Sequence, residues 1–163
     1  MKKLKEMKKN NKGFSLVELI IVIAIMAVLM AVLAPQFLRY VERSRLQSDN
    51  TAIGEIANAC KVAATNETAI TGAPIEITIP VAPNPAANVT VATTGGGAAA
   101  GVTAFQNEIN ATIGTVRLTS NTYTAAGATA PTITVTVTGG VVQVNGTNYI
   151  PEVGATAEPN HLF

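Results

Sequence analysis

The first 65 residues show two successive hydrophobic patterns, and the first is uniformly apolar. From Leu19 to Leu38 there are twenty consecutive residues without a charge. At about 1.5 Å per residue, a helix of this length measures about 30 Å, the thickness of the hydrocarbon core of a bilayer. The stretch therefore predicts a helix that is able to span a membrane.

Beyond Pro35 the apolar positions fall on one side of a helix. Apolar residues recur at intervals of three, four and sums of these, and charged residues take the other positions. The apolar set is Leu38, Val41, Ala52, Ile53, Ile56, Cys60 and Ala63, and the charged set is Arg39, Glu42, Arg43, Arg45, Asp49, Glu55 and Lys61. This spacing predicts an amphipathic continuation that stops between Thr65 and Pro74, so that residues 14–65 form one helix about 75–80 Å long. Pro35 removes a hydrogen bond inside that helix and predicts a kink.

The rest of the chain alternates between Thr and apolar residues with the period of a β-strand. The clearest part is residues 132–150, where two turns, Gly139-Gly140 and Asn145-Gly146, predict an antiparallel meander of three strands. Further strands are expected at 76–79, 88–91 and 115–119, a flexible loop at 95–101 and a short helix at 103–112. The apolar face of this sheet needs a cover, and the amphipathic helix is the only large one available.

These patterns define an α+β fold in which a long N-terminal helix precedes an antiparallel β-sheet head. Four segments are expected: a basic leader, an apolar helix, an amphipathic helix packed on the head, and a globular head rich in Thr, Ala and Gly. Their bounds are 1–13, 14–38, 39–65 and 66–163.

The net charge of +1 averages two oppositely charged parts. Residues 1–13 hold six lysines and one glutamate, whereas the rest of the chain holds five basic and nine acidic residues. A basic flank beside a span stays on the cytoplasmic side, so the C-terminal part is expected to be exported. Arg117 is the only basic residue from Gly72 to Phe163, which leaves no surface suited to nucleic acid.

The chain shows no constellation of residues typical of an enzyme. It has one histidine, His161, expected in a frayed tail, and one cysteine, Cys60, expected to be buried and unable to form an internal disulfide. No metal-ligand spacing, phosphate loop or hydrolase motif occurs. We therefore expect no catalytic residue, no cofactor and no metal site.

The junction between the leader and the apolar run carries a motif. The residues Lys12-Gly13-Phe14-Ser15-Leu16-Val17-Glu18-Leu19 combine a glycine that ends a basic leader, an aromatic residue and a glutamate five positions after the glycine; Pro35 follows. This pattern resembles the type III signal sequence of type IV prepilins and of type II secretion pseudopilins. An ordinary secretory signal, cut after Ala34, is the alternative, but the apolar run is too long for it.

The resemblance implies a life cycle. It implies cleavage between Gly13 and Phe14 by a prepilin peptidase, N-methylation of Phe14, and polymerisation through the helix by an assembly platform and motor proteins. The precursor would be a single-pass protein of the cytoplasmic membrane, and the product a homopolymeric surface filament for adhesion, motility or DNA uptake. Unwinding near Pro35 on assembly is also implied, although the run has no glycine. The absence of a cysteine pair resembles pilins of Gram-positive bacteria.

Glu18 is the one carboxylate at the start of the apolar run. An unpaired carboxylate in lipid or in an apolar bundle is unfavourable by several kcal/mol, so it needs a partner. Cleavage would create an α-amine on Phe14, and the amine of a neighbouring chain would pair with Glu18 and set the register of the subunits. A glutamate that merely snorkels to the headgroups is the alternative.

Two other functions remain open from the sequence. A pseudopilin of a type II secretion or competence system would share this N-terminus. A signal-anchored surface protein would keep its leader and would not polymerise.

Overall fold

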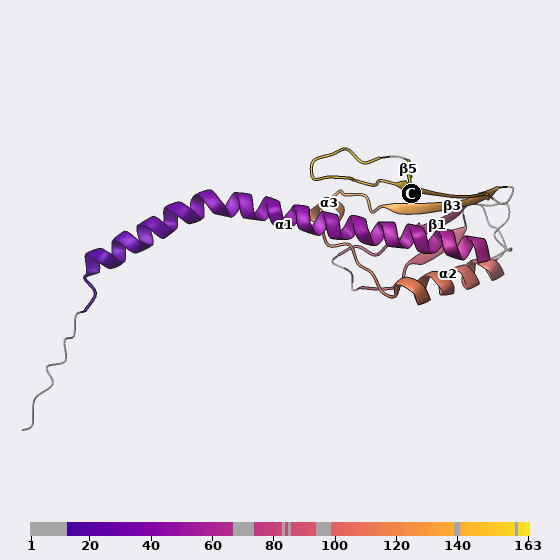
Figure 1. Ribbon diagram of the computed structural model, residues 1–163, viewed down its shortest axis with the longest axis horizontal. Helices are drawn as coiled ribbons and strands as arrows, with labels where there is room; N and C mark the ends of the chain where they lie inside the picture. The colour runs from indigo at the N-terminus through magenta and orange to yellow at the C-terminus, as the bar shows by residue number, and fades with distance from the viewer. Residues whose placement is uncertain are drawn as a thin grey trace, which may run out of the picture. The chain divides into compact units, whose positions relative to one another are not determined.

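The computed structural model describes residues 13–66, 74–82, 84, 86–93, 99–138, 141–158 and 160–163. The elements, in chain order, are α1 (Leu16–Asn66), β1 (Ile75–Thr78), β2 (Thr90–Thr93), α2 (Ala99–Ile113), α3 (Asn121–Thr124), β3 (Thr132–Thr138), β4 (Val141–Thr147) and β5 (His161–Leu162) (Figure 1). A long helix followed by an antiparallel sheet confirms the predicted α+β class. The chain forms two compact units, Met1–Arg39 and Tyr40–Phe163.

In the first unit, the described residues from Leu16 onward are helical and belong to α1. Every side chain from Gly13 to Arg39 is exposed, including the large apolar ones. Pro35 lies inside α1, which is helical on both sides of it. The apolar run is therefore a helix, as predicted, and none of its described residues is buried.

The second unit contains a five-stranded sheet in the order β2-β1-β3-β4-β5. All neighbouring strands are antiparallel, and β3 is paired with β1 on one side and with β4 on the other. The alternation of β3 behaves as predicted, because Ile133 and Val135 are buried while Thr132, Thr134 and Thr136 beside them are only partly covered.

The amphipathic half of α1 covers this sheet (Figure 1). One hydrophobic core joins α1, α2 and the strands. Its buried members from α1 are Leu46, Ile53, Ile56, Ala57, Ala59, Cys60, Ala63 and Ala64. Leu38 was expected on this face but is 67% exposed, and Val41 is only partly covered, so the packed face begins at Leu46.

The predicted third strand of the meander is wrong. Asn145 and Gly146 do not form a turn; they lie within β4, opposite Thr134 and Ile133 of β3. Gly146 fits there because a Cβ at this position would come within 2.7 Å of the Phe163 ring. The chain bends instead at Asn148, whose φ of 57° is left-handed, and β4 pairs with β5.

Two other predictions also need correction. Residues 115–119 form no strand, and contribute only two isolated bridges, through Val116 to Ala87 and through Leu118 to Val81. The helix expected at 103–112 is confirmed but longer, because α2 begins at Ala99 within the predicted loop. The rest of that loop, residues 95–98, lies outside the described residues, as do residues 1–12 of the leader and the turn at Gly139-Gly140.

Candidate functional site

The predicted processing junction lies just before the first turn of α1. Gly13 and Phe14 have no regular secondary structure, and Phe14 is 90% exposed. A Cβ placed on Gly13 would meet nothing within 4 Å. The Gly13–Phe14 peptide bond is thus outside the helix and open to solvent, which is the condition in which a peptidase can bind it.

Glu18 has a partner in its own chain. The backbone N–H of Ser15 donates a hydrogen bond to Glu18 Oε2 at 2.9 Å, and the Ser15 carbonyl accepts the first helical bond, from the Leu19 N–H, at 3.2 Å. Ser15 is therefore the N-cap of α1, and Glu18 occupies the third helical position. This is one half of a capping box, which satisfies an N–H group at the helix start.

The position of Glu18 is also electrostatically favourable. It is the acidic residue of the first turn of α1, where the positive end of the helix dipole stabilises a carboxylate. Removing Gly13 and the residues before it would place a new amine on Phe14, one residue from the N–H that Glu18 already binds. The structure thus brings Glu18 close to the predicted new terminus, while Pro35 lies well along the helix from it.

The apolar half of α1 is a continuous exposed surface. Its large apolar side chains are each more than half exposed, and α1 includes a window apolar and long enough to cross a membrane, none of which is buried. Exposure of this much apolar surface marks a site of interaction with lipid or with other proteins.

In the head, two carboxylates of α1 hold the segment that leads into α3. Asp49 accepts hydrogen bonds from the N–H groups of Thr119, at 2.9 Å, and Ser120, at 2.7 Å. Glu42 accepts the N–H of Thr122 at 3.0 Å. The two acids are seven residues apart, so they lie on the same face of the helix. Asp49 is only 4% exposed, which corrects its assignment to the outer face.

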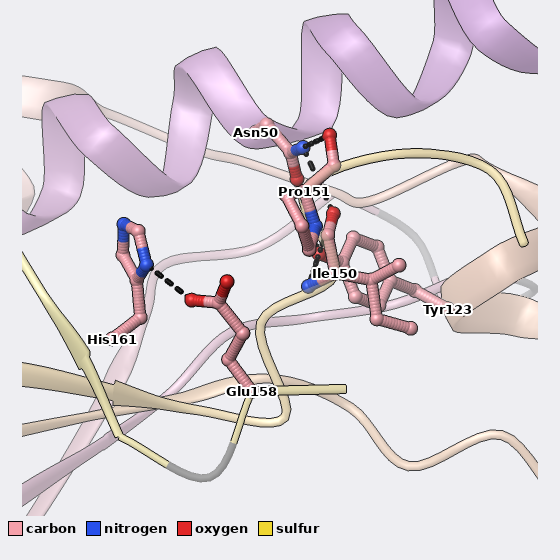
Figure 2. A network of polar contacts seen from close by, with 6 residues as sticks. All are labelled: Asn50, Tyr123, Ile150, Pro151, Glu158 and His161. Carbon is pink, nitrogen blue, oxygen red and sulfur yellow. Dashed lines mark hydrogen bonds and ion pairs between the residues drawn. The ribbon is translucent and has the colours of Figure 1, made fainter. Parts of the chain in front are cut away.

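A second polar network lies beneath the loop that follows β4 (Figure 2). The Tyr123 hydroxyl donates to Asn50 Oδ1 at 3.0 Å and accepts the N–H of Ile150 at 3.0 Å. The Asn50 amide donates to the carbonyls of Ile150, at 3.0 Å, and Pro151, at 3.3 Å. Burial raises the pKa of Tyr123 to about 12, and the nearby Tyr149 and Asp49 act in the same direction. Tyr123 is therefore neutral, and its hydroxyl connects α1 to this loop through hydrogen bonds.

The C-terminal residues contact the same loop through Tyr149. His161 stacks on Tyr149 with ring centroids 4.1 Å apart. Its Nδ1 contacts a carboxylate oxygen of Glu158 (Figure 2). Phe163 meets both rings edge-on. Burial, followed by the charge of Glu158, raises the pKa of Tyr149. The expected frayed tail is thus wrong, because His161 belongs to β5 and packs in this cluster.

These head contacts are suited to holding loops, and the described residues include no group of three His, Cys, Asp or Glu that could hold a metal ion. Cys60 is fully buried, as predicted, and burial raises the pKa of its thiol from 9.0 to about 12. Glu18, Glu42 and Asp49 each accept backbone N–H groups.

The sequence reasoning missed several of these residues. The Ser15-x-x-Glu18 spacing is a capping-box signal and was available in the sequence. No local signal identifies Asp49, Asn50 or Tyr123. Asp49 and Thr119 are 70 residues apart in the chain, Asn50 and Tyr123 are 73 apart, and only the fold brings them together.

Known proteins resemble the N-terminal part of the chain. Residues 8–34 match the family described as the prokaryotic N-terminal methylation motif. Three type IV major fimbrial proteins FimA from Dichelobacter nodosus are 40% identical to the chain over 53 residues, which is 32% of this chain. The aligned part spans about a third of the length of these relatives, 33–34%. No solved structure matches the chain.

The chain is therefore type IV pilin-like. It carries the N-terminal methylation motif and a segment similar to part of a type IV fimbrial protein, and an α+β head follows.

Proposed function

We propose that this protein is the precursor of a type IV pilin, and that its mature form is the major subunit of a surface filament. The observation that carries the proposal is the methylation motif of residues 8–34, together with the large apolar side chains of α1 within it, each more than half exposed. An exposed apolar helix is unfavourable in water but is accommodated by lipid before assembly and by neighbouring helices after it.

In this proposal the chain passes through three states. The precursor lies across the cytoplasmic membrane with its leader inside, because six lysines precede Gly13. A prepilin peptidase cuts between Gly13 and Phe14 and the Phe14 amine is methylated. The mature helix then leaves the lipid and packs against identical helices, with Glu18 of one chain meeting the Phe14 amine of the next. An assembly platform and motor proteins would drive that transfer.

The head supports this function without taking part in chemistry. Its core and its two polar networks fix the loops that would face solvent or neighbouring subunits. The relatives are named major fimbrial proteins, which favours a major pilin over a pseudopilin for this chain. A pseudopilin is the second outcome of the experiment below.

The test is a shearing fractionation of cells that express the protein, followed by electron microscopy. We expect long filaments in the sheared fraction that contain this chain. Gly13→Leu is the matched variant: a bulky side chain should block the peptidase, so that the chain keeps its leader and stays in the membrane. Mature-length Gly13→Leu protein would contradict the assigned junction. Wild-type protein that is cleaved but never sheared off as filaments would identify a pseudopilin.

A further inference from the structure

We propose that the arginines that directly follow the apolar run bind the phosphate groups of anionic lipids in the outer leaflet, on the side to which the head is exported. Five basic residues remain after residue 13, and three of them, Arg39, Arg43 and Arg45, lie within seven positions. Basic residues beside a span normally favour the cytoplasmic side. Their concentration on the exported side therefore needs a reason.

The first argument is that these guanidinium groups are not used within the chain. All three side chains are exposed. Among the residues that the structure describes, none of the three has a carboxylate within ion-pair distance. Glu42, the carboxylate next to them in sequence, instead accepts the N–H and the hydroxyl of Thr122, at 3.0 and 3.1 Å. The arginines are therefore available to an external anion.

The second argument is their depth. Arg39 lies 21 residues after Glu18 on the same helix, a rise of about 32 Å, which matches the hydrocarbon core of a bilayer. When Glu18 lies at the inner interface, Arg39 reaches the outer one. The next residue, Tyr40, is an aromatic side chain that is 72% exposed, of the kind enriched where a span enters the headgroup region.

The third argument is the chemistry of the groups. A guanidinium presents paired N–H donors that match two phosphate oxygens, and it stays charged at any physiological pH. Arg39 and Arg43 are four residues apart, so they lie on one side of the helix. Phosphodiester headgroups at the membrane surface fit this pair better than a small soluble anion does, because the helix holds the arginines at that level.

The consequence concerns the mature subunit. Cleavage after Gly13 would remove all six leader lysines, so that the arginines would become the main fixed positive charges of the membrane segment. Their contacts with lipid phosphate would then set how deep the helix lies before assembly. This inference rests on the membrane insertion in the proposed function, but not on cleavage or polymerisation.

The experiment is lipid retention by the full chain in neutral detergent micelles, read by native mass spectrometry. Phosphatidylglycerol and phosphatidylcholine with identical acyl chains are the two probes. We expect preferential retention of phosphatidylglycerol, reduced about fivefold by each of Arg39→Gln, Arg43→Gln and Arg45→Gln, and about a hundredfold by the three together. Arg117→Gln, an exposed arginine of the head, is the control and should change nothing.

Three further outcomes decide the proposal. All forms are compared in a full chain whose six leader lysines are replaced by glutamine, so that the leader itself does not attract phosphatidylglycerol. Unchanged thermal unfolding of the triple variant shows that its head is intact. Equal retention of the two lipids by the wild type, or full retention of phosphatidylglycerol by the triple variant, would overturn it, as would displacement of the lipid by millimolar inorganic phosphate.

Discussion

Glu18 accepts a hydrogen bond from Ser15 within its own chain, and it is also the group expected to meet the amine of a neighbour. The two roles need different properties of the side chain. The cap needs only an acceptor oxygen, whereas the pair with an amine needs a negative charge. Substitutions at this one position therefore separate them.

We predict that Glu18→Ala and Glu18→Gln are both inserted and cleaved, since Gly13 and the apolar run are intact, but collect in the membrane instead of in filaments. Gln keeps the acceptor for the Ser15 N–H and loses only the charge. Shearing fractionation, with leader removal scored by size, measures both steps.

The results for the two variants distinguish the explanations. If the cap alone mattered, Glu18→Gln would form filaments and Glu18→Ala would not. Normal filament yield from Glu18→Ala would contradict both roles and favour the alternative, a glutamate that only reaches the lipid headgroups. Failure of cleavage would move the role of Glu18 to recognition by the peptidase.

Cys60 gives a second test at the scale of a residue. The thiolate is the reactive form of cysteine, and burial raises the pKa of this thiol to about 12. At pH 8 we expect the native chain to resist alkylation by iodoacetamide and the chain in denaturant to be labelled rapidly. Because the folded pKa is the higher one, the contribution of this group to stability is complete below pH 9 and declines as the pH rises towards 12. Rapid labelling of the native chain would contradict the burial of this face of α1.

At the scale of elements, α1 has two halves with opposite surroundings. Its first half exposes large apolar side chains, and its second half buries Ile56 and its neighbours against the sheet. The second half is therefore part of the head's core and not a separate stalk.

A charge in that core should destabilise the head. Ile56→Asp places an unpaired carboxylate at a fully buried position and should lower the free energy of unfolding by about 3 kcal/mol or more. Val62→Asp, on the same helix but 60% exposed, is the control and should have an effect below about 0.5 kcal/mol. Denaturant unfolding of the full chain in detergent measures both. Equal stability of the two variants would show that α1 does not form the core.

The elements with a strong period were predictable from the sequence, and the short or irregular ones were not. α1 and β3 have long runs of regular spacing, so their positions followed from the pattern. The Asn145-Gly146 pair was misassigned because it has the composition of a turn. In the fold both residues pair with β3, and the Phe163 ring lies 2.7 Å from where a Cβ of Gly146 would be. β5 has two residues, too few to show a period.

The candidate site divides in the same way. The junction and Glu18 could be predicted as site residues because their motif is contiguous in the sequence. The bonds from Asp49 to Thr119 and Ser120 join residues 70 and 71 positions apart, and only the fold brings these together. Asp49 was therefore placed on the outer face from its charge alone. Its partners are backbone N–H groups, so no residue of opposite charge in the sequence indicates that it is buried.

At the scale of the whole molecule, the chain combines a helix with no buried residue in the described part of its apolar half and a head that has its own core. The exposed apolar surface of such a chain is unfavourable in water, and contact with lipid or with other copies would cover it. The proposed pilin cycle provides both in succession, and leader removal separates the two stages.

The central claim is that the chain is cut before Phe14 and then polymerised, and intact mass combined with N-terminal sequencing of sheared surface filaments tests it most directly. We predict a subunit that begins at Phe14 and carries one methyl group on its amine. A surface filament whose subunits still begin at Met1, or material that begins at Phe14 but is confined to the membrane, would contradict it.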